Sequence, residues 1–228
     1  MGAEPLGVLV SLSVPERWLE ALDHLADGIG EAARAAGAPI VGGDLTGAAQ
    51  LTIAVTVLGH TAAPLERSGA RAGDSLYVTG CLGGPAAALR AWLRGREPAA
   101  EARSRFARPT PRLREGVWLA RHGAHAAIDI SDGLLGDAAH LAAASGVRLV
   151  VDLDRLPVLP GMRPADAAAS GEEYELLVAA PKLDPEAFAR ELGLALTPIG
   201  HVEAGPAEVD ARLAGARVAS PRGFDHFS

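Results

Sequence analysis

The sequence predicts an α+β fold, an α/β sandwich in which strands and helices alternate along a chain of 228 residues. Two observations support this prediction. Apolar, strand-like runs are repeatedly followed by segments with helical spacing, and 49% of the residues are hydrophobic, which is enough for a substantial core. A polar, glycine-containing stretch, TAAPLERSGARAGD at residues 61–74, interrupts the alternation. It predicts two lobes, over residues 1–64 and 65–228.

The first lobe is expected to contain a strand, a long helix and two further apolar runs. LGVLVSLS (6–13) is strand-like, and residues 13–37 have helical periodicity. Ser13 and Glu16 have the spacing of a capping box at the start of this helix, and Gly37 marks its end. PIVGGDL (39–45) is interpreted as a short buried run, and LTIAVTVLGH (51–60) as a strand.

The second lobe repeats the alternation several times. Strands are predicted in SLYVTG (75–80), AHAAIDI (124–130), VRLVVDL (147–153) and YELLVAAP (174–181), and helices in residues 84–95, 109–123, 132–145 and 184–192. The basic run RSRFARPTPRLR (103–114) is expected to be a solvated connection and a helix start. Trp18 and Trp92 lie on apolar faces and are expected in the core.

Composition excludes several classes of function. The net charge of −7 and a pI near 5.5 argue against a nucleic-acid partner. No apolar run is long enough to span a membrane, and no basic region precedes the apolar start, so we expect a cytoplasmic protein without a signal peptide. GxxxxGK[ST] is absent, and TGCLGG (79–84) is not a dinucleotide motif. His122 and His125 lack a third nearby ligand for zinc.

An unusual polar turn follows the apolar run AHAAI. Asp129 and Ser131 fall on one side of the predicted strand, and Asp132 opens the next helix. Helix capping by Ser131 or Asp132 is one explanation, but it leaves Asp129 unexplained. The alternative is a Mg²⁺ site, because Mg²⁺ prefers carboxylate oxygens and holds phosphates.

Two further turns combine acidic residues with neighbouring apolar strands. PIVGGDLTG (39–47) delivers Asp44 behind Gly42 and Gly43, whose lack of a side chain would let a ligand approach the backbone. An ordinary turn is the alternative. ASGEEYELL (169–177) places Glu172 and Glu173 before a strand, although such acidic loops are commonly only solvated.

Taken in order, these motifs resemble those of the thiamine-monophosphate kinase family, within the superfamily that includes aminoimidazole ribonucleotide synthetase. The resemblance spans almost the whole chain. It depends on the following segments: GGD (42–44), RSGARAGDSLYVTG (67–80), RPTPR (108–112), AIDISDGLLGD (127–137), SGEEYEL (170–176) and GFDHF (223–227). AIDISDGLLGD and SGEEYEL are the most specific of them.

The resemblance implies ATP-dependent phosphorylation of thiamine monophosphate to thiamine diphosphate, assisted by several Mg²⁺ ions. It implies that Asp44, Asp129 and Asp132 bind Mg²⁺. ATP would be contacted by Gly43, Asp44, Arg67 and Ser131, and thiamine monophosphate by Glu172 and Phe224. Arg108 and Arg112 match the family but receive no catalytic role, and no catalytic side chain is assigned.

The same resemblance implies a ferredoxin-like amino-terminal lobe that is shortened here, followed by an α/β lobe of the aminoimidazole ribonucleotide synthetase type. Family chains begin upstream of Met1, in a segment with further acidic metal ligands. The family's homodimer is therefore in doubt for this chain. Two alternative functions stay open: a nucleotide- or partner-binding remnant, and a related ATP-using enzyme such as a selenophosphate or aminoimidazole ribonucleotide synthetase.

Overall fold

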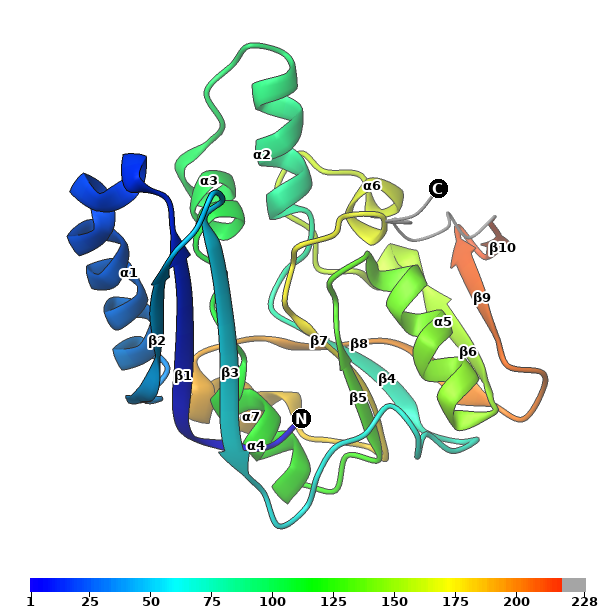
Figure 1. The fold of residues 1–228 in the computed structure, drawn as a ribbon. Coiled ribbons are helices and arrows are strands. Elements are labelled where there is room, and N and C mark those ends of the chain that lie inside the picture. Colours follow the sequence, from blue (N-terminus) through cyan, green and yellow to red (C-terminus); the bar gives the residue numbers. More distant parts are fainter. Residues whose placement is uncertain (219–228) are drawn as a thin grey trace. The chain divides into compact units, whose positions relative to one another are not determined.

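A computed structural model describes residues 1–218, and its contacts divide the chain into two compact units (Figure 1). Met1–Gly2 and the chain from Ala63 onward form the larger unit, and Ala3–Ala62 form the smaller one. Each contains both helices and strands, which confirms the predicted α+β class. No helix within residues 1–218 is long and apolar enough to cross a bilayer.

The larger unit is built on a seven-stranded sheet with the order β10-β9-β6-β8-β4-β7-β5. Neighbouring strands are antiparallel except for β6 and β9. The strands are β4 (Ser75–Thr79), β5 (Ala126–Asp129), β6 (Arg148–Asp152), β7 (Leu176–Ala180), β8 (Leu196–Glu203), β9 (Glu208–Leu213) and β10 (Ala216–Arg217).

Helices cover both faces of this sheet. The helices of this unit are α2 (Gly84–Leu93), α3 (Ala100–Ala107), α4 (Leu113–Arg121), α5 (Leu134–Ser145), α6 (Pro164–Ala168) and α7 (Pro185–Leu192), with the short η2 (Leu153–Arg155). Alternate residues of β4 point to opposite faces, as a strand requires. Leu76 and Val78 join the apolar cluster that contains α5, whereas Tyr77 joins the cluster that contains Trp118 of α4 and Phe188 of α7.

Two expectations for this unit are wrong. The basic segment 103–114 is not only a connection, because α3 occupies Ala100–Ala107 and buries Ala102 in a small cluster with Ala88 and Leu159. Trp92 is not a core residue, since 38% of it is exposed. Its ring instead meets Phe106 edge-on, with centroids 5.2 Å apart, and so joins α2 to α3 at the surface.

The smaller unit is a three-stranded sheet with one long helix. Its elements are β1 (Glu4–Val14), η1 (Glu16–Ala21), α1 (Leu22–Ala35), β2 (Ile40–Gly47) and β3 (Thr52–His60). The central strand β1 pairs in parallel with β2 and antiparallel with β3.

Local sequence signals fail at three places in this unit. Ser13 caps no helix, because β1 continues through Val14 and Ser13 pairs with both Thr46 and Thr52. The run 39–45 is not buried, since every residue of β2 is exposed. Trp18 is 40% exposed and is likewise not a core residue. In the first case the ladder of backbone hydrogen bonds overrides the capping pattern.

Candidate functional site

The most polar turn of the larger unit lies where β5 meets α5. Ala126, Ala127 and Ile128 are buried, and Asp129 ends the strand half-buried. Ile130 is fully buried, so the turn is anchored in the core while the half-buried Ser131 and Asp132 stand at its edge. Gly133, with φ 109°, occupies the N-cap position of α5. The alternative that Ser131 or Asp132 is the N-cap residue is therefore wrong.

Asp137, in the first turn of α5, holds the backbone of this polar turn by hydrogen bonds. One of its carboxylate oxygens accepts the backbone N–H of Ser131 at 2.9 Å and that of Asp132 at 3.1 Å. Asp137 itself is only 3% exposed. Burial raises the pKa of its carboxyl, the two amide donors oppose that rise, and the charges of Asp132 and Asp129 add to it. A buried carboxylate beside two others thus fixes the backbone that presents them.

The acidic loop before β7 lies directly against the same turn. Glu172 donates its N–H to the carbonyl of Ser131 at 2.8 Å, and Tyr174 donates its N–H to the carbonyl of Ile130 at 2.9 Å. Ile130 in turn donates to the carbonyl of Glu175 at 2.8 Å. Glu172 and Tyr174 have φ values of 60° and 52°, a left-handed conformation that is unfavourable for such side chains.

Tyr174 lies next to the carboxylates of this turn and loop. Its hydroxyl donates to the Glu172 carboxylate at 2.8 Å, and this hydrogen bond is the main reason why the pKa of Tyr174 is raised. Partial burial contributes, followed by the negative charges of Glu172, Asp129 and Asp132. The larger unit therefore brings together four of the predicted site residues: Asp129, Ser131, Asp132 and Glu172.

A buried ion-pair network supports this loop. Arg112 donates from Nε to one oxygen of the fully buried Glu175 at 2.8 Å and from Nη2 to the other at 2.5 Å. Thr79 of β4 donates to Glu175 at 2.7 Å and accepts the N–H of Leu176 at 2.8 Å. Arg112, left without a role by the sequence pattern, thus holds the base of the acidic loop by a two-point contact.

Glu173 is the second buried carboxylate of the loop. Its Oε1 accepts the N–H of Gly83 at 2.5 Å, whereas its Oε2 has no hydrogen-bond partner among the described residues and lies 3.5 Å from Nη2 of Arg105. Burial raises the pKa of this carboxyl, and the hydrogen bonds from Ser170 and Gly83 oppose the rise. The side chain thus ties the acidic loop to the start of α2.

Arg67 lies elsewhere in the larger unit. It is exposed, and its carbonyl accepts the hydroxyl of Ser145, the last residue of α5, at 2.9 Å. Ser131 precedes the first turn of the same helix. A helix of 12 residues spans about 18 Å, so Arg67 and Ser131 are not brought together. One ligand can meet both only if it is extended.

Gly43 and Asp44 belong to β2 of the smaller unit. A side chain at Gly43 would place its Cβ 1.8 Å from the carbonyl oxygen of Val10, so strand packing already requires glycine there. Asp44 pairs with Ser11, on the face of the sheet opposite Val10 and Leu12. Its side chain is exposed. That Asp44 lies close to Asp129 stays a prediction.

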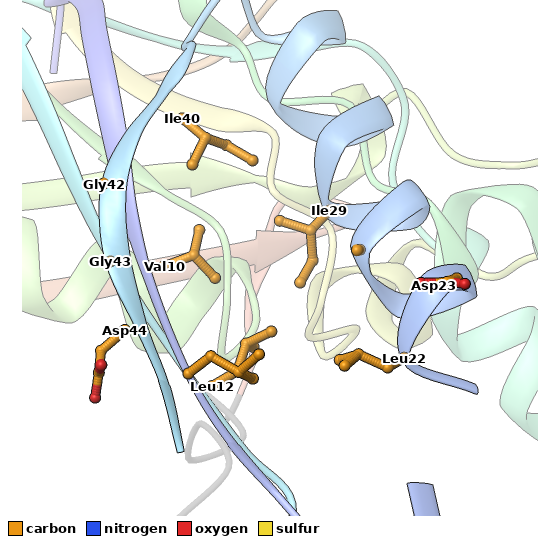
Figure 2. Close-up of a pocket in the computed structure, with 11 residues that line it drawn as sticks. Val10, Leu12, Leu22, Asp23, Ile29, Ile40, Gly42, Gly43 and Asp44 are labelled. Carbon is orange, nitrogen blue, oxygen red and sulfur yellow. The ribbon is translucent and has the colours of Figure 1, made fainter. Parts of the chain in front are cut away.

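The same unit has a groove of about 510 Å³ between α1 and the sheet. Figure 2 shows apolar side chains directed into it, among them Val10, Leu12, Ile29 and Ile40, while the Asp44 carboxylate points away. Such a lining does not suit a triphosphate. The groove therefore gives no support to the nucleotide contacts expected of Gly43 and Asp44.

Three further expectations concern histidines, metal ligands and Phe224. His122 stacks on Trp118 with ring centroids 3.6 Å apart, and Nδ1 of His125 lies 2.9 Å from the Asp74 carboxylate, so the two rings serve different neighbours. Within residues 1–218, no three His, Cys, Asp or Glu side chains are grouped closely enough to hold a metal ion by themselves. Phe224 lies outside the described residues.

Several supporting residues were not predicted as members of the site. Asp137 and Glu175 belong to the recognised motifs, but their contacts run through backbone amides and a buried arginine that sequence spacing does not reveal. A carboxylate inside a strongly apolar helix (LLGDAAHL) is the available signal for Asp137, because an uncompensated buried charge is costly. Ser145 gives no comparable signal.

Comparison with known proteins places these features in a family context. The chain matches the model of the AIR synthase related protein, N-terminal domain, over residues 1–61 and that of the AIR synthase related protein, C-terminal domain, over residues 71–211. It is 39% identical over 212 residues to the thiamine-monophosphate kinase of Pyrococcus horikoshii, covering 90% of this chain and 67% of that protein.

Two further relatives show similarity to the same family. The thiamine-monophosphate kinase of Salmonella typhimurium is 36% identical over 250 residues, covering all of this chain and 75% of that protein. A solved structure of AaThiL complexed with AMPPCP and TMP superposes with a TM-score of 0.85 at 32% identity, covering 99% of this chain and 75% of that one. The chain thus spans about two thirds to three quarters of the length of these relatives.

Proposed function

The chain belongs to the thiamine-monophosphate kinase family, and we propose that it transfers the γ-phosphoryl group of ATP to thiamine monophosphate, giving thiamine diphosphate. The observation that supports this most strongly is the gathering of Asp129, Ser131, Asp132 and Glu172 where the β5–α5 turn meets the loop before β7. The relative complexed with AMPPCP, a nucleoside triphosphate analogue, and TMP supports the same substrates.

The donor set of this turn fits Mg²⁺. Asp129 and Asp132 supply carboxylate oxygens, which are the hard ligands that Mg²⁺ accepts. Mg²⁺ commonly uses one or two protein carboxylates and completes its shell with water and substrate phosphates. A pair of aspartates without a third acidic ligand is therefore sufficient. When bound, the ions would neutralise phosphate charge and align the in-line attack.

The side chains of the turn then have separate tasks. Asp129 and Asp132 would hold the ions on the backbone that Asp137 fixes, and the Ser131 hydroxyl would donate to a phosphate oxygen of ATP. Glu172 faces the substrate, where its carboxylate complements the cationic thiazolium ring of thiamine. The accepting phosphate oxygen is already ionised near neutral pH, so no general base is needed. Transfer is direct, without a phosphoenzyme.

Direct assay of the reaction tests this proposal. The chain is incubated with ATP, Mg²⁺ and thiamine monophosphate, and thiamine diphosphate is quantified by chromatography. We expect product with wild type and a loss of at least about 100-fold with Asp129→Asn or Asp132→Asn, because each removes a charge that holds the ions. Arg103→Ala, at an exposed position on α3, is the matched control and should retain full activity.

Two outcomes contradict the proposal in different ways. Nucleotide binding without any thiamine diphosphate would favour a binding protein over a kinase. Full activity in both aspartate variants would mean that the turn serves the fold alone.

Use of ATP with a chiral γ-phosphate tests the direct mechanism, which predicts inversion at phosphorus, whereas a phosphoenzyme predicts retention.

A further inference from the structure

We infer that Ser145 is a positioning residue for nucleotide binding, which it achieves by fixing the backbone loop that presents Arg67. This inference rests on the proposed function, because the resemblance assigns Arg67 to ATP. The juxtaposition that supports it is local: the hydroxyl of Ser145, at the end of α5, hydrogen-bonds the backbone of residues 67–70.

The Ser145 hydroxyl uses its entire hydrogen-bonding capacity on this loop. It accepts the N–H of Gly69 at 3.2 Å and that of Ala70 at 3.2 Å, and it donates to the carbonyl of Arg67 at 2.9 Å. A serine hydroxyl has one donor and two acceptor positions, so nothing remains for a neighbour or solvent. The three hydrogen bonds therefore hold the backbone from the carbonyl of Arg67 to the N–H of Ala70.

This loop has no helix or strand of its own and depends on such contacts. The carbonyl of Glu66 accepts the N–H of Ala127 at 3.0 Å on one side, and the Asp74 carboxylate accepts the N–H of Arg71 at 2.8 Å on the other. Between these anchors, the Ser145 side chain holds the backbone of residues 67–70. The Arg67 side chain is exposed, and the position from which it projects is set by that backbone.

The clamp is rigid because α5 is packed along its length. Leu134, Ala138, Leu141 and Ala142 of this helix are buried completely. The same helix fixes the Ser131–Asp132 turn at its start, through Asp137, and the Arg67 loop at its end. One buried element therefore sets the separation of two candidate nucleotide contacts, which is what binding an extended polyanion requires.

The experiment compares Ser145→Ala, Ser145→Thr and Ser68→Ala in the full chain. Ser68 lies in the same loop, but its hydroxyl donates to the Glu66 side chain at 3.0 Å and holds no backbone group, so it is the matched control. Affinity for AMPPCP with Mg²⁺ is measured by calorimetry, and hydrogen exchange of the Gly69 and Ala70 amides reports on the clamp itself.

We expect Ser145→Ala to weaken AMPPCP binding about tenfold and to accelerate exchange of both amides, while Ser145→Thr and Ser68→Ala stay near wild type. In steady-state assays, the KM for ATP should rise with little change in kcat. In an Arg67→Ala background, Ser145→Ala should have no further effect on affinity, because Ser145 acts through Arg67.

Each contrary result has a distinct meaning. Faster amide exchange in Ser145→Ala with unchanged nucleotide affinity would overturn the inference and leave Ser145 a purely structural residue. Additive losses in the double variant would overturn it as well, because Ser145 would then act independently of Arg67. If wild type bound no AMPPCP, the proposed function would fail and the nucleotide role of Ser145 with it, and exchange would still report whether the clamp exists.

Discussion

Replacement of Asp137 separates the task of holding the acidic turn from the task of carrying charge. Asp137→Ala removes the oxygen that accepts the amides of Ser131 and Asp132 at 2.9 and 3.1 Å. Hydrogen bonds to a charged acceptor are each worth about 1.5–3 kcal/mol, and relief of burial and of repulsion from Asp129 and Asp132 offsets part of this. The expected net loss is about 2–4 kcal/mol.

Asp137→Asn is the matched variant, because it keeps a carbonyl oxygen for both amides and replaces the other, charged oxygen with an uncharged NH2 group. Thermal and urea unfolding measure the effect, and the alanine variant should unfold about 5–15 °C lower than wild type for a chain of this size. The asparagine variant should be at least as stable as wild type. Equal and large losses in both variants would refute the reasoning, because the charge rather than the acceptor geometry would then be essential.

The pH dependence of Asp137→Asn follows from the sign of the shift. The pKa of Asp137 is raised in the folded state, mainly by burial, so its contribution to stability is fully present at low pH and is lost as pH rises through the folded pKa. The asparagine variant should therefore gain stability relative to wild type over the interval that begins at about pH 4, the ordinary pKa of an aspartate. A relative loss over that interval would contradict the assigned environment.

Three further perturbations test the frame around the site. Arg112→Met leaves the Glu175 charge buried without its two-point partner and should cost about 3–5 kcal/mol in urea unfolding, whereas loss of the exposed pair in Arg103→Ala should cost less than about 1 kcal/mol. Gly69→Ala places a Cβ 2.5 Å from the carbonyl oxygen of His125 at φ 134° and should destabilise by more than about 2 kcal/mol, while Gly146→Ala meets open space and should cost about 1 kcal/mol. Hydrogen bonds from Arg163 and Arg90 hold the pKa of Asp166 well below its usual range, so the stability that wild type has over Asp166→Asn should be present at neutral pH and disappear as pH falls below about 4. A larger loss of stability in Arg103→Ala than in Arg112→Met, or in Gly146→Ala than in Gly69→Ala, would contradict the corresponding contact. For Asp166, a difference from wild type that did not change with pH would do so.

Much of the larger unit follows from sequence periodicity. The short apolar run in SLYVT predicts β4, and the polar turn after AHAAI predicts where Asp129 and Asp132 leave the core. The strand β9, EVDARL, is not predicted, because its half-buried positions retain charged residues and dilute the apolar pattern. The basic helix α3 is missed for a related reason: a single buried alanine, Ala102, is enough to seat it.

The supporting contacts of the site are harder to predict than its acidic residues. Motif order identifies Asp129, Asp132 and Glu172 as candidates, and their metal and substrate roles stay predictions. Two of the partners that set their geometry are distant in sequence: Arg112 reaches Glu175 across 63 residues, and Ser145 reaches Arg67 across 78. Asp137 is nearer and binds amides five and six residues earlier. No local spacing encodes the two distant contacts, because they depend on how strands and helices pack.

We propose above all that the turn after β5 holds divalent ions for phosphoryl transfer. Crystals grown with Mn²⁺ and AMPPCP test it most directly, because anomalous scattering locates Mn²⁺ without reference to the protein. We predict a metal peak about 2.2 Å from a carboxylate oxygen of Asp129 or Asp132, with a phosphate oxygen completing its shell. Bound nucleotide whose metal ions contact neither aspartate would contradict the account.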